Sequence, residues 1–174
     1  GVMDGTFITN ILAGASVSVT DSISSNPSQL WNLTINNFSD DFVISSAGLM
    51  LNDAILNNSG ILSLIGDISI TGNGTINNTG TLFKGGSTNY VSFDSAITFN
   101  NATTGSLDVS IGELNFNSIS SSFEGNINVG PGGTLSGTSI ISFAGATVTN
   151  NGVINVTDFR FEGSTLQSLN GSGT

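Results

Sequence analysis

The chain has 174 residues, of which 37% are hydrophobic and only 8% are charged, and its formal net charge is −10. Its two basic residues, Lys84 and Arg160, face twelve acidic ones, which argues against binding to nucleic-acid phosphates or to anionic membrane surfaces. The absence of cysteine excludes disulfides and thiolate metal sites, and no apolar run approaches the 18 or so residues that a membrane-spanning helix needs. A polar surface of Ser, Thr and Asn, with a single Lys, is typical of a secreted or cell-surface protein.

Residues 1–31 contain two stretches of alternating apolar and polar residues, 6–9 and 15–20, which predict short strands. Asn26-Pro27 then interrupts the chain. This region follows the later repeat least well, so we expect a degenerate coil that caps one end of the fold, because terminal repeats are usually atypical. The alternative is an arm that pairs with a neighbouring molecule. The residues that such an arm would use for self-assembly are Phe7, Ile8, Ile11 and Leu12.

From residue 32 onward, one short phrase recurs along the chain. It consists of an apolar residue, one or two asparagines and, shortly afterwards, a glycine. The interval between copies is roughly 20–28 residues, and a repeat in this range is typical of a solenoid, in which each repeat stacks on the next. The clearest copies are at 55–60, 75–80 and 98–101, and fainter ones are at 34–37, 127–130, 148–152 and 169–171.

Each period divides into three short strand candidates in which every second residue is apolar, so that one face is apolar and the other polar. Three strands in about 22 residues predict an all-β fold, a parallel β-helix of about seven coils that forms a single domain over 32–174. An antiparallel sandwich has similar strand spacing but gives no reason for the same turn to recur. The expected strands are 61–64, 67–71, 74–77, 81–84, 90–93, 96–99, 106–116, 121–124, 126–129, 133–136, 139–143, 146–149, 153–156, 158–162 and 165–169.

The asparagines have a physical role in this fold. A β-helix turns a sharp corner at the same place in every coil, and Asn and Gly tolerate the backbone angles found there. Stacked Asn side chains can also hydrogen-bond from coil to coil as a ladder. We expect one such column, formed by Asn36, Asn57, Asn77, Asn100, Asn128, Asn150 and Asn170. We expect the interior to be filled in its wider parts by Phe93, Phe99, Phe116, Phe143, Phe159 and Phe161.

No residue pattern indicates catalysis or a cofactor. Asp40 and Asp41 are weak candidates for Ca²⁺ ligands, because this cation takes six to eight oxygen ligands, but we favour the interpretation that these acids keep the surface soluble. Glycosidases need paired carboxylates, whereas the three glutamates are spread over separate coils. We therefore expect no enzyme, with a polysaccharide-active β-helix as a minor alternative. The glutamates are Glu113, Glu124 and Glu162.

The nine residues 74–82, Gly-Thr-Ile-Asn-Asn-Thr-Gly-Thr-Leu, with an echo at 146–152, resemble the repeats of bacterial surface β-helices. The nearest group comprises the filamentous-haemagglutinin-like adhesins and autotransporter passengers. The resemblance implies an extracellular rod without enzymatic activity that serves adhesion or display.

Together, these observations predict a structural or adhesive protein of the cell surface. Self-association and a carbohydrate or other cell-surface ligand are the expected partners. The alternative is a subunit of an extracellular filament, joined end to end or by strand donation from the N-terminal arm. This alternative arises because the end of a β-helix is an open edge of unpaired backbone groups.

Overall fold

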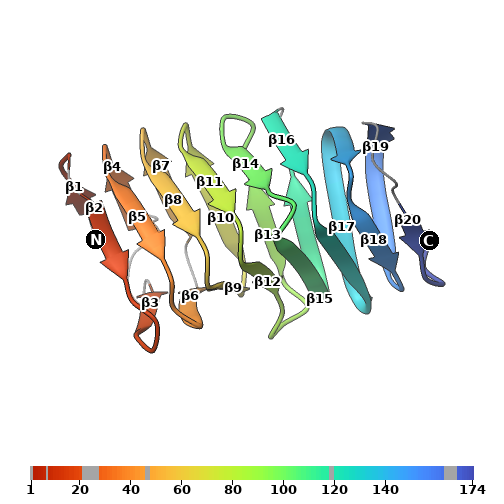
Figure 1. Ribbon diagram of the computed structural model, residues 1–174, viewed down its shortest axis with the longest axis horizontal. Coiled ribbons are helices and arrows are strands. Elements are labelled where there is room, and N and C mark those ends of the chain that lie inside the picture. Colours follow the sequence, from red (N-terminus) through yellow and green to blue (C-terminus); the bar gives the residue numbers. More distant parts are fainter. Residues whose placement is uncertain (1, 7, 21–27, 46–47, 118–119, 163–167) are drawn as a thin grey trace.

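A computed structural model describes residues 2–6, 8–20, 28–45, 48–117, 120–162 and 168–174 (Figure 1). These residues form twenty β-strands and no helix, and the strand pairs are parallel. The chain is therefore a parallel β-solenoid, which confirms the predicted fold class and contradicts the antiparallel sandwich. Within the same residues, no helix is long and apolar enough to cross a membrane.

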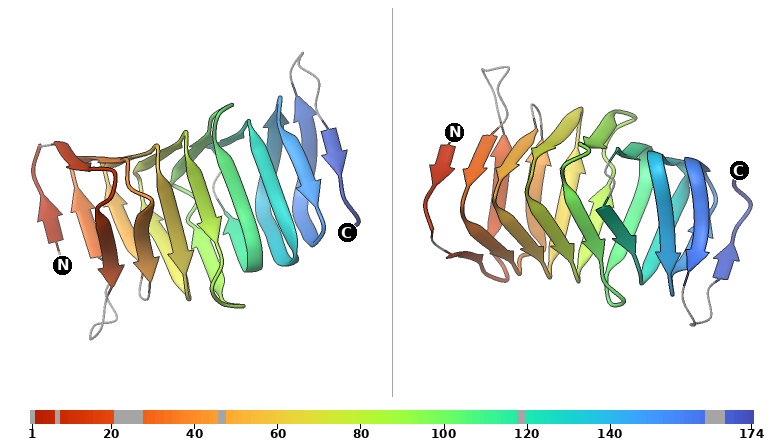
Figure 2. Two further views of the ribbon diagram at one scale, coloured as in Figure 1. Left: turned by 60° about the horizontal axis from the view of Figure 1, so that its bottom comes forward. Right: turned by 90° about the horizontal axis from the view of Figure 1, so that it is seen from above.

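Each coil contributes a strand to each of three faces, and the coils stack from the N-terminal to the C-terminal end of a rod (Figure 2). Face one contains β1 (Val2–Asp4), β4 (Ser28–Trp31), β7 (Leu49–Asn52), β10 (Ile68–Gly72) and β13 (Tyr90–Phe93). Face two contains β2 (Ile8–Ile11), β5 (Thr34–Asn37), β8 (Ile55–Asn58), β11 (Thr75–Asn78), β14 (Thr98–Asn101) and β16 (Ser120–Phe123). Face three contains β3 (Ser16–Thr20), β6 (Asp41–Ser45), β9 (Ile61–Ile65), β12 (Thr81–Lys84), β18 (Thr147–Asn150) and β20 (Ser168–Asn170).

Three longer strands continue around corners and belong to more than one face: β15 (Ser106–Phe116), β17 (Asn126–Ala144) and β19 (Val153–Glu162). The sequence predicted three separate strands within the range of β17. They correspond to its straight parts, which pair with different faces of the neighbouring coils. Shifts in register between Val109 and Ile111, and between Gly137 and Ile140, mark corners at which the ladder nevertheless continues.

The register gives the length of each coil directly, as the difference between the residue numbers of successive Cα partners. On face two, the coil from Asn10 to Asn36 is the longest and the one from Ser142 to Arg160 is the shortest. Coil length therefore varies by several residues while the pairing stays in register. The whole column is Asn10, Asn36, Asn57, Asn77, Asn100, Ser122, Ser142 and Arg160.

The N-terminal segment, 1–31, forms part of the rod where it is described. Strands β1, β2 and β3 pair in parallel with β4, β5 and β6 of the next coil. Their side chains are more exposed than those of later coils, because they form the N-terminal end of the stack. One backbone edge of the segment that we proposed as an arm is therefore already paired with the next coil of the same chain.

The interior changes in composition along the rod. Leucine and isoleucine predominate in the interior of the N-terminal coils, whereas the C-terminal coils combine aliphatic side chains with a cluster of phenylalanine rings whose neighbouring centroids are 4.7 to 5.9 Å apart. Four of the six phenylalanines expected inside are fully buried, and Phe159 is half-buried. Phe161 is 43% exposed, because it lies at the C-terminal end of the stack. The buried rings are Phe93, Phe99, Phe116, Phe143 and, not anticipated from the sequence, Phe42 and Phe123.

Candidate functional site

An asparagine column runs along the outside of face two, and we call it the outer ladder. Each Nδ2 donates to the Oδ1 of the asparagine in the preceding coil, and all four hydrogen bonds are 2.9 Å long. Four of its members belong to the column that the sequence predicted. Asn10 extends it by one coil, although the first coil lacks the Asn pair and carries Ile11 instead of a second asparagine. The outer ladder is Asn10, Asn36, Asn57, Asn77 and Asn100.

A second asparagine column lies inside the rod, one residue further along each strand. We call it the inner ladder, and it consists of Asn37, Asn58, Asn78 and Asn101, all fully buried. Here each Nδ2 donates to the Oδ1 of the next coil, over 2.6, 2.7 and 2.7 Å. The same Nδ2 atoms also donate to backbone carbonyls of face three, as Asn78 does to Ser106 over 2.9 Å. These buried amides therefore join neighbouring coils at the corner between faces two and three.

The sequence analysis missed the inner ladder, although the signal was present. In Thr75-Ile76-Asn77-Asn78, the second asparagine lies two residues after the inward-pointing Ile76. Side chains two residues apart in a strand share a face, so Asn78 must point into the rod. A buried amide needs hydrogen-bond partners, and the equivalent amides above and below supply them.

Three of the seven predicted ladder residues lie elsewhere. Asn128 is on the outside of face three, where its register neighbours are Asp108 and Thr149. Asn170 follows Thr149 in that same column. Asn150 points inward on face three, 8% exposed, and donates to the carbonyl of Thr174 over 3.3 Å. The prediction of a single column was wrong because the Asn phrase marks a strand end before a corner, and such ends occur on two faces.

The glycine of the phrase has a steric role. A Cβ atom on Gly60 would lie 2.0 Å from the carbonyl oxygen of Ser39, and one on Gly80 would lie 2.2 Å from that of Gly60. Gly60 and Gly80 form the corners that follow the inner ladder, and successive corners stack backbone on backbone. Only glycine permits this approach, which explains why the phrase ends as it does.

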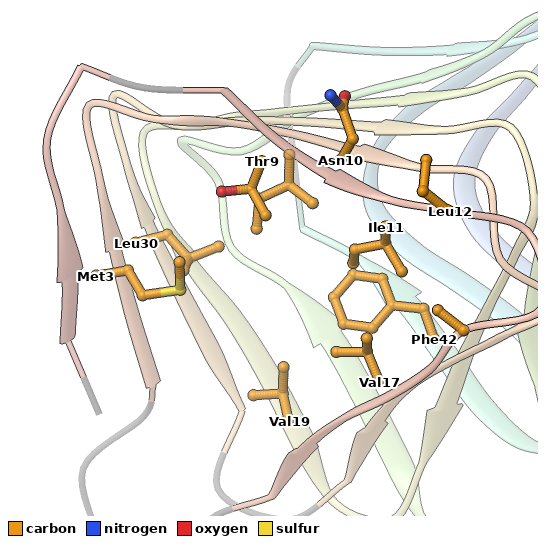
Figure 3. Close-up of a pocket in the computed structure, with 11 residues that line it drawn as sticks. Met3, Thr9, Asn10, Ile11, Leu12, Val17, Val19, Leu30 and Phe42 are labelled. Atoms are coloured by element: carbon orange, nitrogen blue, oxygen red, sulfur yellow. The ribbon is translucent and has the colours of Figure 1, made fainter.

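An apolar hollow of about 540 Å³ opens at the N-terminal end of the rod (Figure 3). Of the proposed arm residues, Ile11 is 7% exposed and lines the hollow, while Leu12 lines it and is 66% exposed. Ile8 is 67% exposed on the outside of face two, and Phe7 lies outside the described residues. The hollow can accept only an apolar group, because its walls are almost entirely hydrocarbon. Other residues that line it are Met3, Val17, Val19, Leu30 and Phe42.

Asp40 and Asp41 do not lie in a larger group of acids within the described part of the chain. Asp41 accepts a hydrogen bond from the Ser16 hydroxyl, and Asp40 is exposed. In the part of the chain that the structure describes, no three His, Cys, Asp or Glu side chains form a group that could hold a metal ion. The two weak Ca²⁺ candidates thus have no third acidic partner among these residues.

A hollow of about 290 Å³ with a mostly polar lining is on face one. The Ser136 hydroxyl donates to Glu113 Oε1 over 2.5 Å and accepts from Asn115 Nδ2 over 2.6 Å. Glu113 is the single carboxylate in its lining, and neither of the other glutamates contributes to it. The hollow therefore lacks the carboxylate pair that acid–base cleavage of a glycosidic bond uses.

Lys84 is fully buried inside the rod, a position that the sequence analysis did not anticipate. In its inward column it lies between Leu64 and Val109. Its Nζ donates to the carbonyls of Ser87 and Ile111, over 3.1 and 3.3 Å. Burial lowers the pKa of this ammonium group below its ordinary value, and the negative charge of Asp67 partly opposes the shift.

Comparison with protein-family models, with curated proteins and with solved structures finds no match for this chain.

Proposed function

We propose that the chain is a non-enzymatic structural rod of an extracellular surface that presents its faces for adhesion. The observation that supports this proposal most is the inner ladder, which joins four consecutive coils through fully buried amides. Each buried amide is costly unless it is paired, so the ladder favours one fixed stacking of the coils. A rod of fixed stacking transmits force and keeps its faces at a constant spacing.

The character of the faces also supports adhesion. On the outside of face two, the hydroxyls of Thr34, Thr75 and Thr98 lie beside the outer ladder. Such a surface offers neutral hydrogen-bonding groups at intervals of about 4.8 Å or twice that distance, because Ile55 interrupts the threonine column between Thr34 and Thr75. It favours ligands that carry many hydroxyl or amide groups, and gives little attraction to a highly charged partner.

Adhesion can be tested with beads coated with the folded protein, on surfaces covered with epithelial cells or with extracellular matrix. The matched control is the same protein immobilised after irreversible thermal unfolding. We expect the folded coating to retain beads under flow at least several-fold better. Equal retention by the two coatings would contradict an adhesive role for the folded rod.

The filament alternative has its own support in the two ends of the rod. The N-terminal hollow exposes Leu12, and Ile8 lies on the adjoining strand β2, while Phe161 and Leu169 are 43% and 54% exposed at the other end. Two apolar ends with parallel strand edges are suited to head-to-tail stacking, in which one copy continues the sheets of the next.

Sedimentation velocity and negative-stain microscopy over a range of protein concentrations test this alternative. Leu12→Asp places a charge at the rim of the hollow, whereas the control Ile55→Asp places one on the side of the rod, at a residue that is 40% exposed. Filaments that are lost in the first variant and kept in the second would support end-to-end assembly. Single short rods at every concentration of the unmodified protein would rule it out.

A further inference from the structure

A groove of about 280 Å³ crosses the outside of face three, and we call it the face-three groove. Phe83, Asp108 and Asn128 are successive Cα partners from three consecutive coils and line this groove together. A flat ring, a carboxylate and an amide therefore follow one another along the rod at intervals of about 4.8 Å. Val109, Ser110 and Gly130 complete the lining.

The ring of Phe83 is an unusual feature of this column. Its neighbours along the face are Ser63, Asp108 and Asn128, and it is half-buried rather than hidden in the core. A Cβ on Gly85 would lie 2.3 Å from the ring's Cζ, so the ring packs directly on the glycine backbone. This packing holds the ring in one orientation without covering it, as a preformed apolar platform requires.

The polar groups beside the ring are also held in place. Asp108 Oδ1 accepts hydrogen bonds from the Ser106 hydroxyl over 3.0 Å and from Asn128 Nδ2 over 2.5 Å. These bonds orient both side chains and use one of the two Nδ2 hydrogens of Asn128. Within the described residues, Asp108 Oδ2 and Asn128 Oδ1 receive no hydrogen bond, so the groove presents two free acceptors next to an aromatic surface.

We propose that the face-three groove binds a neutral sugar residue. The ring face of Phe83 is electron-rich and attracts the polarised C–H groups on one side of a pyranose. Hydroxyl groups on the edge of the same sugar then donate to Asp108 and Asn128. Anionic ligands are disfavoured, because the groove contains a carboxylate and the chain carries a net charge of −10. The inference rests on the proposed adhesive function and names its ligand class.

A primary amine is the competing ligand, since an ammonium group can pair with Asp108 and lie over Phe83. A sugar fits the groove better, because its two free acceptors come from different coils and face donors at two separated points. A lysine ammonium is one compact charge and satisfies mainly the carboxylate. The two ligands also differ in their salt dependence, since charge pairing at a surface weakens as the ionic strength rises.

The probe is an array of immobilised neutral oligosaccharides, printed together with sulfated forms of the same glycans and with a lysine-containing peptide. Phe83→Thr removes the platform with a residue that favours strands, and Asp108→Ala removes the carboxylate. Matched controls away from the groove are Phe38→Ala, at a side chain that is 46% exposed, and Asp40→Ala. Circular dichroism verifies that each variant is folded, and Phe83→Tyr retains an aromatic ring.

We expect the unmodified protein to bind at least one neutral glycan, with the sulfated form bound more weakly. Phe83→Thr and Asp108→Ala should each lower the affinity about tenfold or more, while both controls and Phe83→Tyr bind normally. The proposal is overturned if no neutral glycan binds, if the two groove variants bind like the unmodified protein, or if only the peptide binds and salt abolishes this. Beads that still adhere in that event would leave the adhesive function standing without this site.

Discussion

The N-terminal and C-terminal halves of the rod fill the same structural position with opposite chemistry. One inward column on face two begins at Ile11, continues through the inner ladder and ends as phenylalanine. The register links them without a break, as Asn37, Asn58, Asn78, Asn101, Phe123, Phe143 and Phe161. The interior beside a corner therefore accepts either a hydrogen-bonded amide or an aromatic ring. The difference shows that the fold fixes the position of a side chain and leaves open how that position is stabilised.

The two solutions differ in what they demand of their neighbours. A ring is stabilised by burial and contact, as when Phe116 stacks on Phe93 with centroids 4.7 Å apart. An amide is stabilised only if particular donors and acceptors surround it, and the inner ladder ends where Asn101 donates to the backbone carbonyl of Glu124. We therefore expect the C-terminal half to tolerate substitutions that change the shape of a buried side chain. We expect the N-terminal half to be destabilised by substitutions that remove a buried polar group.

The two ladders also run in opposite senses. Donors of the inner ladder point toward the C-terminal coils, as from Asn58 to Asn78, and those of the outer ladder point back, as from Asn77 to Asn57. The amide dipoles of adjacent residues thus oppose each other, so that stacking further coils does not build up a large net dipole.

The largest effect is expected in the phenylalanine half. Phe116 contacts the rings of Phe93, Phe99 and Phe123 at centroid distances of 4.7 to 5.1 Å. Phe116→Ala should lower the free energy of unfolding by about 3–5 kcal/mol, through lost burial and the cavity left behind. Urea unfolding followed by circular dichroism measures this. Phe116→Leu restores most of the volume with a different shape and should recover more than half of the loss; equal losses in both variants would show that this half does not tolerate a change of shape.

A somewhat smaller effect, with a different pattern, is expected in the ladder half. Asn78→Ala leaves Asn101 Oδ1 and the Ser106 carbonyl short of a donor, and it deprives Asn58 of an acceptor. Because an unsatisfied buried polar group costs about 1–3 kcal/mol, we expect a loss of about 3 kcal/mol in total. Asn78→Leu fills the space without restoring the hydrogen bonds, so the same urea measurement should show little recovery. Recovery as large as that of Phe116→Leu would remove the distinction between the halves.

The sequence predicted those features that a single pattern determines, and it did not predict those that depend on competing patterns or on the register between coils. The recurrent phrase and the two-residue alternation were enough to predict the solenoid and four members of the outer ladder. The buried position of Lys84 was not predicted, and two rules compete there: its spacing from the buried Leu82 puts it inside, whereas its charge suggests the surface. The face-three groove could not be predicted from the sequence, because coil length varies along the rod and only the observed register aligns Phe83 with Asp108 and Asn128.

Lys84 lies where the ladder half meets the phenylalanine half, and its buried ammonium group makes the free energy of unfolding depend on pH. Its folded-state pKa is lowered by burial, so between that pKa and the ordinary lysine value of about 10.4 the unfolded chain binds more protons. The free energy of unfolding should therefore rise with pH across this alkaline window. Urea midpoints measured from neutral to strongly alkaline pH should show a steeper rise for the unmodified protein than for Lys84→Met. Parallel pH profiles would contradict the inference that Lys84 is charged and desolvated in the folded state.

The smallest effect concerns the outer ladder and separates burial from hydrogen bonding. Asn77 and Asn78 are adjacent asparagines, and both bond to the equivalent residues of the coils above and below. Asn77 is half-buried, so water can replace its partners, and Asn77→Ala should cost only about 0.5–1.5 kcal/mol in urea unfolding. Asn78→Ala is its matched control, with the same atoms removed one residue away. If the two substitutions lower the free energy of unfolding equally, burial away from water does not explain the strength of the inner ladder. The contrast between an interior filled with amides and one filled with rings would then depend only on the number of hydrogen bonds.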